Sequence, residues 1–209
     1  RQLGSLWLRA TQSVGESAFS GQWTYFPVVL GVKLTLPMML LVAIGSTRSL
    51  LSERHNWRIS SILLILSSFI VLVPALIGRF QLGVRHMLPM FPFLALLAGS
   101  AFVGGARFQW YSRLRVLGVL LVLWHVAESV LVHPDYIAYF NQTIRGREEN
   151  YFWDSNLDWG QDLARLGRYV NEKEITPLYL SYFGTALPEK HGLSDANPLY
   201  WHYDLLALE

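Results

Sequence analysis

The chain of 209 residues is 52% hydrophobic and only 15% charged, with a mean hydropathy of +0.29. These values exclude an ordinary soluble domain and favour a membrane protein. The charge is unevenly divided, because residues 1–133 carry 11 Lys/Arg against 3 Asp/Glu and residues 134–209 carry 6 against 12. The absence of cysteine excludes disulfides and thiolate metal sites.

Four apolar segments lie in the first part of the chain, at residues 24–44, 60–78, 87–104 and 114–132. Each is near the ~20 residues that a helix needs to cross a hydrocarbon core of ~30 Å. The alternative, buried helices of a soluble protein, would leave almost no solvated surface in this part of the chain. The sequence therefore predicts an α-helical polytopic membrane bundle of about four transmembrane helices over residues 1–133.

The basic residues of the short loops predict an orientation. Positive charge favours the cytoplasmic side, and the first and third loops carry six arginines against two in the middle loop. The middle loop and residues 134–209 are therefore expected outside the cytoplasm. The arginines concerned are Arg48, Arg54, Arg58, Arg107, Arg113 and Arg115 on the inner side, and Arg79 and Arg85 on the outer side.

Aromatic residues near the expected outer ends of the spans predict an interfacial belt. Tryptophan and tyrosine are enriched where the membrane meets water. The residues are Trp23, Tyr25 and Phe26 before the first span, and Tyr136, Tyr139 and Phe140 after the last.

Lys33 lies inside the first span, and Pro37 follows it by four residues. Because proline lacks an N–H, Pro37 frees the carbonyl of Lys33 and predicts a kink or a restart of the helix. An intramembrane charge is a candidate functional site, although its long stem could also carry the ammonium towards the outer interface.

The stretch GVRHMLPMFPFL places Arg85 and His86 just before the third span, with Pro89 suited to the first turn of a helix. Unpaired N–H groups at a helix N-terminus, together with a cation, favour a phosphate. The alternative is that Arg85 anchors ordinary lipid head groups.

His125 and Glu128 share one face of the last span. Two such residues do not define a metal site, and Glu128 is near enough to the outer end to be hydrated. The pair is interpreted as structural or supporting.

Residues 134–209 are polar and acidic, and they predict a small extracytoplasmic α/β domain. Trp159, Leu163, Leu166 and Val170 follow helical spacing, and residues 177–183 read as a short strand. We expect this domain to be incomplete and the chain to be a fragment, because it lacks an initiator methionine and stops before a sheet could close.

The stretch DSNLDWGQD, residues 154–162, allows two local interpretations. As an EF-hand, Asp154, Asn156 and Asp158 occupy the first three ligand positions, but Trp159 replaces the turn glycine and Arg165 the bidentate glutamate. A less regular metal site stays open. The second interpretation is a capping box of Asp158 and Gln161, with Asp162 in the first turn of the helix.

The chain resembles the later half of bacterial membrane glycosyltransferases of the GT-C fold. The resemblance is carried by four stretches in this order: GQWTYFPVVLGVKLTLPMML, GVRHMLPMFPFLALLAG, HPDYIAYFNQ and DSNLDWGQDLARLGRYV. These phospholipid-carrier-dependent enzymes are related to protein O-mannosyltransferases and lipid A aminoarabinose transferases. The resemblance covers residues 21–184 and implies a multi-pass protein of the bacterial inner membrane. It also implies transfer of a sugar from a polyprenyl phosphate to an acceptor on the extracytoplasmic face.

The resemblance implies roles for some residues. Lys33 and Arg85, with His86 as a third choice, match positions that bind the lipid phosphate. The family's acidic base lies in an early outer loop that we do not find, so no catalytic residue is assigned and we expect this chain to be inactive alone.

The remaining motif residues are assigned to the acceptor side of the site or to a structural role. They are Asp154, Asn156, Asp158, Trp159, Gln161 and Asp162. A divalent metal is left open, the acceptor is unspecified, and no nucleic acid is expected. The alternative function is a transport or scaffold component that binds lipid phosphate without chemistry.

Overall fold

The computed structural model describes residues 23–78, 83–103, 110–148, 151–152, 156–182 and 184–198. The chain divides into two compact units, Arg1–Asn156 and Leu157–Glu209, which we call the membrane unit and the C-terminal unit. This boundary lies later than the one predicted after residue 133, because the described residues between 134 and 156 group with the apolar helices. Arg79, Arg107 and Asp154 lie outside the described residues.

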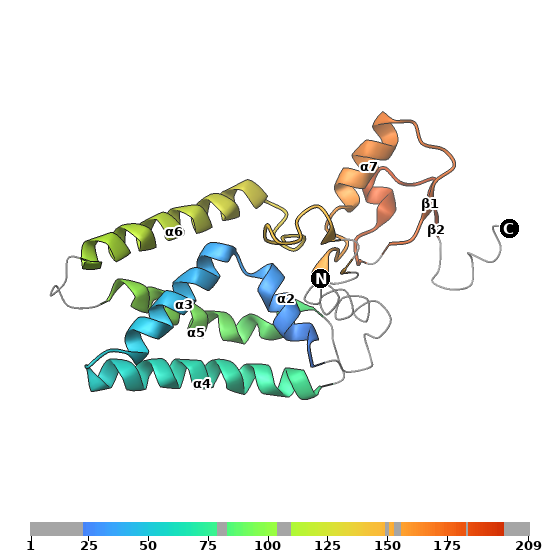
Figure 1. The fold of residues 1–209 in the computed structure, drawn as a ribbon. Helices are drawn as coiled ribbons and strands as arrows, with labels where there is room; N and C mark the ends of the chain where they lie inside the picture. The colour runs from blue at the N-terminus through green and yellow to red at the C-terminus, as the bar shows by residue number, and fades with distance from the viewer. Residues whose placement is uncertain are drawn as a thin grey trace, which may run out of the picture. The chain divides into compact units, whose positions relative to one another are not determined.

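The membrane unit is a helical bundle (Figure 1). Three of its described helical segments are long and apolar enough to cross a membrane, and a fourth crossing is possible if one bent pair forms a single span. All four predicted segments thus coincide with helices. In chain order these are α2 Tyr25–Lys33, α3 Leu36–Leu50, α4 His55–Ile77, η1 Val84–Met90, α5 Phe91–Gly99, η2 Ser100–Phe102 and α6 Trp110–Val132.

The first predicted span is two helices rather than one. The axes of α2 and α3 differ by 107°. The backbone is extended at Thr35, whose hydroxyl accepts the amide N–H of Met38 at 3.3 Å, and Pro37 occupies the first turn of α3. Because the missing N–H of a proline costs nothing in a first turn, the restart predicted at Pro37 is confirmed.

Helix α4 buries two of its four serines and exposes many of its large apolar residues. Only Ser61 and Ser68 are buried in this helix. Small residues let membrane helices approach one another, and the surrounding lipid takes the place of a hydrophobic core. The exposed apolar side chains of α4 are Ile59, Ile62, Leu63, Leu66, Phe69, Ile70, Val73 and Ile77.

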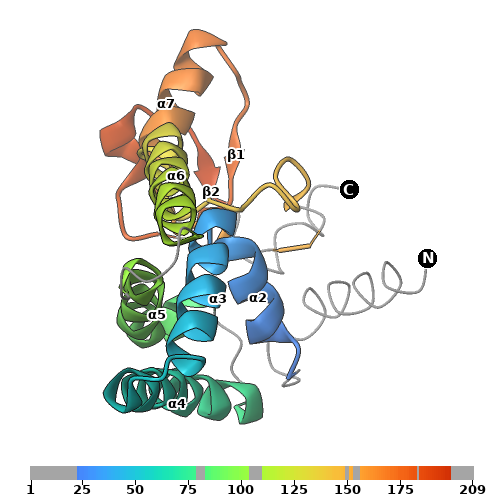
Figure 2. The ribbon, with the colours of Figure 1, turned by 60° about the vertical axis from the view of Figure 1, so that its left-hand side comes forward.

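Helix α3 packs against α4, α5 and α6 (Figure 2). Its backbone comes so close to α5 at Gly45 that an added Cβ would lie 1.9 Å from the carbonyl oxygen of Leu97. At the far end of α3 from the break, Arg48 Nη1 donates to the carbonyl of Ala101 at 2.6 Å. The arginines of the first loop and those at the start of α6 therefore share one end of the bundle, and the α2–α3 break lies at the other (Figures 1 and 2).

The described part of the C-terminal unit contains one amphipathic helix, α7 Leu163–Glu172, and a 3-10 turn, η5 Pro188–His191. Leu163, Val170 and Leu193 form its core. The strands β1 Tyr179–Leu180 and β2 Asn197–Pro198 pair in parallel over two residues each. No larger sheet is present among the described residues, so the structure gives no support to the predicted α/β domain.

The aromatic-belt prediction is wrong for three residues. Tyr25, Phe26 and Phe140 are at most 3% exposed, because protein rather than lipid covers them. Trp23 and Tyr136 are exposed, as a belt requires. Aromatic composition alone does not distinguish these two environments.

Candidate functional site

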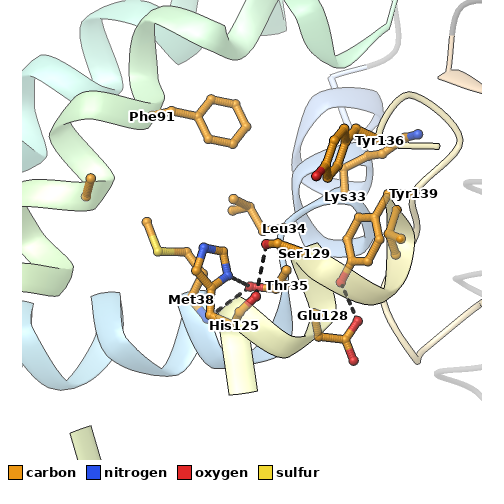
Figure 3. A pocket seen from close by; sticks show the side chains of 12 residues that line it. Lys33, Leu34, Thr35, Met38, Phe91, His125, Glu128, Ser129, Tyr136 and Tyr139 are labelled. Atoms are coloured by element: carbon orange, nitrogen blue, oxygen red, sulfur yellow. Dashed lines mark hydrogen bonds between the residues drawn. The ribbon is translucent and has the colours of Figure 1, made fainter. Parts of the chain in front are cut away.

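A cavity of about 260 Å³ opens beside the α2–α3 break, within the membrane unit. Its wall comes from the break, from α5 and α6, and from the segment that follows α6 (Figure 3). Leu34, Met38 and Phe91 are among its apolar lining residues. Its ionisable or hydroxyl-bearing lining residues include Lys33, Thr35, His125, Glu128, Tyr136 and Tyr139.

Lys33 lines the cavity, but the protein holds its ammonium. Nζ donates to the carbonyl of Ile137 at 2.7 Å and to the carbonyl of Asn156, and it lies 3.8 Å from the centre of the Phe140 ring. An ammonium has three donors, so two of them are committed to backbone oxygens. The cation–π contact adds to this anchoring. Lys33 is therefore not a lysine that merely extends towards water.

Asn156 connects the two predicted membrane motifs. It is 2% exposed, its Nδ2 donates to the Tyr25 hydroxyl at 2.9 Å, and its Oδ1 accepts the N–H of Val84 at 3.2 Å. The same Tyr25 hydroxyl accepts the N–H of Gly83 at 3.0 Å. Asn156, predicted as part of an acceptor-side motif, thus joins Lys33 and α2 to the start of η1.

Arg85 and His86 lie in η1 and are exposed, and neither lines the cavity. Their segment opens as a 3-10 helix, and the N–H of Val84 is taken by Asn156. Pro89 lies late in this 3-10 helix, and Pro92 occupies the first turn of α5. The prediction that Pro89 begins the α-helix is wrong, because seven 3-10 residues precede α5.

Glu128 is 6% exposed and is not hydrated as predicted. Its carboxylate pairs with Arg145 Nη2 at 2.6 Å and accepts from the Tyr139 hydroxyl at 3.3 Å. Trp124 Nε1 donates to it at 3.4 Å, and the amide of Gln142 also donates to it. We call these residues the Glu128 cluster; it fastens the segment after α6 to α6. Burial and the charge of Glu128 raise the pKa of Tyr139 to about 12.

His125 faces the break from α6. Its Nδ1 lies 2.7 Å from the Thr35 hydroxyl oxygen. Figure 3 shows the second ring nitrogen turned away from Thr35, on the side where Met38 and Phe91 lie. The interpretation of His125 as merely structural or supporting does not account for its place in the cavity wall.

The turn before α7 lies in the C-terminal unit and contains Asp158, Trp159, Gln161 and Asp162. Asp158 Oδ1 accepts the N–H of Gly160 at 2.7 Å, and Gln161 Oε1 accepts the N–H of Trp159 at 2.7 Å. The predicted capping box is wrong, because α7 begins only at Leu163 and Asp162 makes no side-chain cap. Trp159 lies outside the helix and is 37% exposed, so it does not share the apolar face of α7.

Metal binding gains no support from the part of the chain that the structure describes. No group of three or more histidine, aspartate or glutamate residues is arranged to hold an ion there. Asp154, the first position of the weighed EF-hand loop, lies outside that part.

Asn141 is the main residue that the sequence interpretation missed. It is fully buried, its Nδ2 donates to the carbonyls of Gly31 and Leu34 at 2.7 and 2.8 Å, and its N–H reaches the carbonyl of Val32 at 2.8 Å. A broken helix in a membrane must satisfy its freed carbonyls within the protein. The available signal was the break at Pro37, which requires such a donor elsewhere in the chain.

No known protein family, curated protein or solved structure matches the chain.

Proposed function

We propose that the chain is part of an integral-membrane glycosyltransferase that moves a sugar from a polyprenyl-phosphate carrier to an acceptor on the extracytoplasmic face. The observation that carries this proposal is the cavity at the α2–α3 break. It joins apolar walls to a lysine, a histidine and hydroxyl groups, in a bundle whose long helices expose apolar side chains. A lipid with a polar head matches this combination.

The orientation of the proposal follows from charge. Arg48, Arg54, Arg58 and the basic start of α6 share the end of the bundle opposite to the break (Figure 1). Because basic loops favour the cytoplasm, the cavity end would face outward. The sugar would then be transferred on the extracytoplasmic side.

In the proposed reaction the bond between the anomeric carbon and the carrier phosphate breaks, and a bond to an acceptor oxygen forms. Positive charge near the departing phosphate favours this step. Lys33 lines the cavity and is the first proposed source, and Arg85, which does not line it, is the second where the phosphate extends beyond the cavity. Lys33 would act mainly through its fixed charge, since two of its protons bind carbonyls. The base that takes the acceptor's proton is not assigned to any residue of this sequence.

The second candidate, a transport or scaffold component that binds lipid phosphate, is favoured by the same anchoring of Lys33. An ammonium held by two carbonyls and an aromatic ring can stabilise the fold and attract a lipid phosphate without taking part in a reaction. The two candidates share the ligand and differ only in turnover.

The test uses the 209-residue chain in lipid nanodiscs, with tryptophan fluorescence as the readout and empty nanodiscs as the blank. Farnesyl phosphate should bind at least about tenfold more tightly than farnesol, since one charge-assisted hydrogen bond contributes at least about 1.4 kcal/mol. Arg85→Gln should weaken binding of farnesyl phosphate, whereas Arg58→Gln, an exposed arginine at the other end, should not. Equal affinities for the two lipids would contradict phosphate recognition.

Turnover separates the two candidates. Membranes from cells that express the protein would be given polyprenyl-phosphate mannose or glucose, and release of free polyprenyl phosphate would be measured. Release supports the transferase. Tight binding of the carrier without release from either donor favours the transport or scaffold component.

A further inference from the structure

Most polar groups of the cavity are already bound to the protein. Lys33 donates to two carbonyls, and the Tyr139 hydroxyl donates to Glu128. Ser129 donates to the carbonyl of its own helix at His125, at 3.0 Å, and the Tyr136 hydroxyl lies 3.2 Å from His133 Nδ1. A ligand in the cavity therefore meets few polar atoms that can still bind it.

Thr35 determines which nitrogen of His125 carries the proton. Its oxygen accepts the N–H of Met38, and its one hydroxyl proton has His125 Nδ1 as its acceptor among the described residues. A hydroxyl proton left without an acceptor beside apolar walls would be costly. In the neutral ring Nδ1 is then the acceptor, so the proton resides on Nε2.

The Nε2–H group has no partner among the described residues. It points away from Thr35, towards the side of Met38 and Phe91 (Figure 3). A lone donor beside apolar walls is suited to an apolar molecule that ends in an oxygen acceptor. The cavity of about 260 Å³ is slightly smaller than typical small-molecule sites of roughly 300–1,000 Å³, so it would hold the head of a long lipid but not its chain.

We propose that His125, with its tautomer set by Thr35, donates a hydrogen bond from Nε2 to the oxygen at the head of an isoprenoid lipid in this cavity. This inference rests on the proposed lipid site and adds its ligand-contacting residue. The oxygen belongs to either a phosphate ester or a free alcohol, and both present the same acceptor. Thr35 acts through His125 and is a positioning residue.

The binding test compares farnesyl phosphate and farnesol on the wild type and on His125→Ala, in nanodiscs. Loss of the hydrogen bond should lower the affinity for both lipids about tenfold. His55→Ala, which removes an exposed histidine at the start of α4, should leave the affinity unchanged. Circular dichroism and thermal unfolding of each variant would confirm that the bundle is folded.

The tautomer test does not depend on ligand. Nitrogen-15 chemical shifts of labelled histidine should show Nε2 protonated and Nδ1 unprotonated at His125 in the wild type. Thr35→Val, which removes the hydroxyl, should redistribute the proton and weaken lipid binding. Thr35→Ser, which keeps the hydroxyl, should preserve the shifts and the affinity.

The outcomes separate this inference from the proposed function. If farnesyl phosphate binds more tightly than farnesol and His125→Ala changes neither affinity, the role of His125 is overturned and the lipid-phosphate proposal stands. If both lipids bind equally and both are weakened by His125→Ala, the role of His125 stands and phosphate recognition fails. A wild-type proton on Nδ1, or no histidine-dependent binding of either lipid, also overturns the inference.

Discussion

Helices α4 and α7 divide their residues between inside and outside in opposite ways. Helix α4 of the membrane unit buries Ser61 and Ser68 and exposes leucine, isoleucine and phenylalanine. Helix α7 of the C-terminal unit buries Leu163 and Val170 and exposes charged side chains. The difference indicates two solvents. In lipid, burying an apolar side chain gains no hydrophobic free energy, so the residues buried between helices are the small ones that pack closely. In water, the hydrophobic effect favours burial of the apolar side chains.

Replacing a leucine in each helix by alanine gives the largest contrast. Leu163→Ala removes a 4% exposed side chain from the core of the C-terminal unit and should cost about 2–5 kcal/mol of unfolding free energy. Leu66→Ala removes the same atoms from a side chain that is 52% exposed, and in lipid it should cost well under about 1 kcal/mol. Hydrogen exchange of α7 and thermal unfolding of the bundle in nanodiscs would measure the two effects. Equal losses would show that both helices face the same solvent.

Two glycine substitutions test whether close approach stabilises the membrane unit. Gly45→Ala forces α3 away from the Leu97 carbonyl and should destabilise the bundle by roughly 1–3 kcal/mol. Gly31→Ala meets no atom within 4 Å and should be neutral or stabilising by up to about 1 kcal/mol. Both changes gain the same helix propensity, so their difference in unfolding free energy isolates the contact. Unchanged stability of the Gly45→Ala variant would contradict the inference that small residues allow the helices to pack closely.

The Glu128 cluster tests the cost of a buried charge in the membrane unit. Glu128→Gln removes the ion pair with Arg145, whose side chain is 43% exposed, and should cost about 1–2 kcal/mol. Glu172→Gln, an exposed residue of α7, should cost nothing measurable. Unfolding in nanodiscs would measure the first change, and hydrogen exchange of α7 the second.

The same variant should alter the titration of Tyr139. Its pKa of about 12 reflects burial first and the charge of Glu128 second, so Glu128→Gln should lower this pKa but leave it above 10. Because the folded-state pKa is raised, the protonated phenol stabilises the fold below pH 10, and this contribution is lost as the pH rises towards 12. The titration of Tyr139 would be measured by tyrosinate absorbance, after subtraction of the absorbance of a Tyr139→Phe variant. An unchanged pKa in Glu128→Gln would exclude Coulombic coupling.

The smallest effect is expected at Asp158. Asp158→Ala removes one exposed hydrogen bond to Gly160 and should cost about 0.5–1 kcal/mol. The loss should appear in the exchange of the Gly160 amide, while α7 stays protected. Asp162→Ala, which breaks only the exposed pair with Arg165, serves as the control. Loss of protection along α7 would restore the capping interpretation.

The motif DSNLDWGQD shows how far the sequence could predict the site. Its spacing allowed a metal loop or a helix cap within one stretch, yet the boundary between the two compact units falls after Asn156. Asn156 binds Tyr25, 131 positions earlier, whereas the side chain of Asp158 binds the nearby Gly160. Local spacing describes a turn such as that of Asp158. It cannot describe a partner that tertiary folding brings to Asn156.

The sequence by itself determined the apolar segments and the restart at Pro37, because span length and the missing N–H of proline are local properties. Only the tertiary structure decided where the membrane unit ends and which polar groups line the cavity. Lys33, His125 and Glu128 were visible in the sequence, but their partners Asn156, Thr35 and Arg145 lie 123, 90 and 17 positions away. A buried polar group must find a partner wherever the fold places one, and sequence periodicity does not encode that distance.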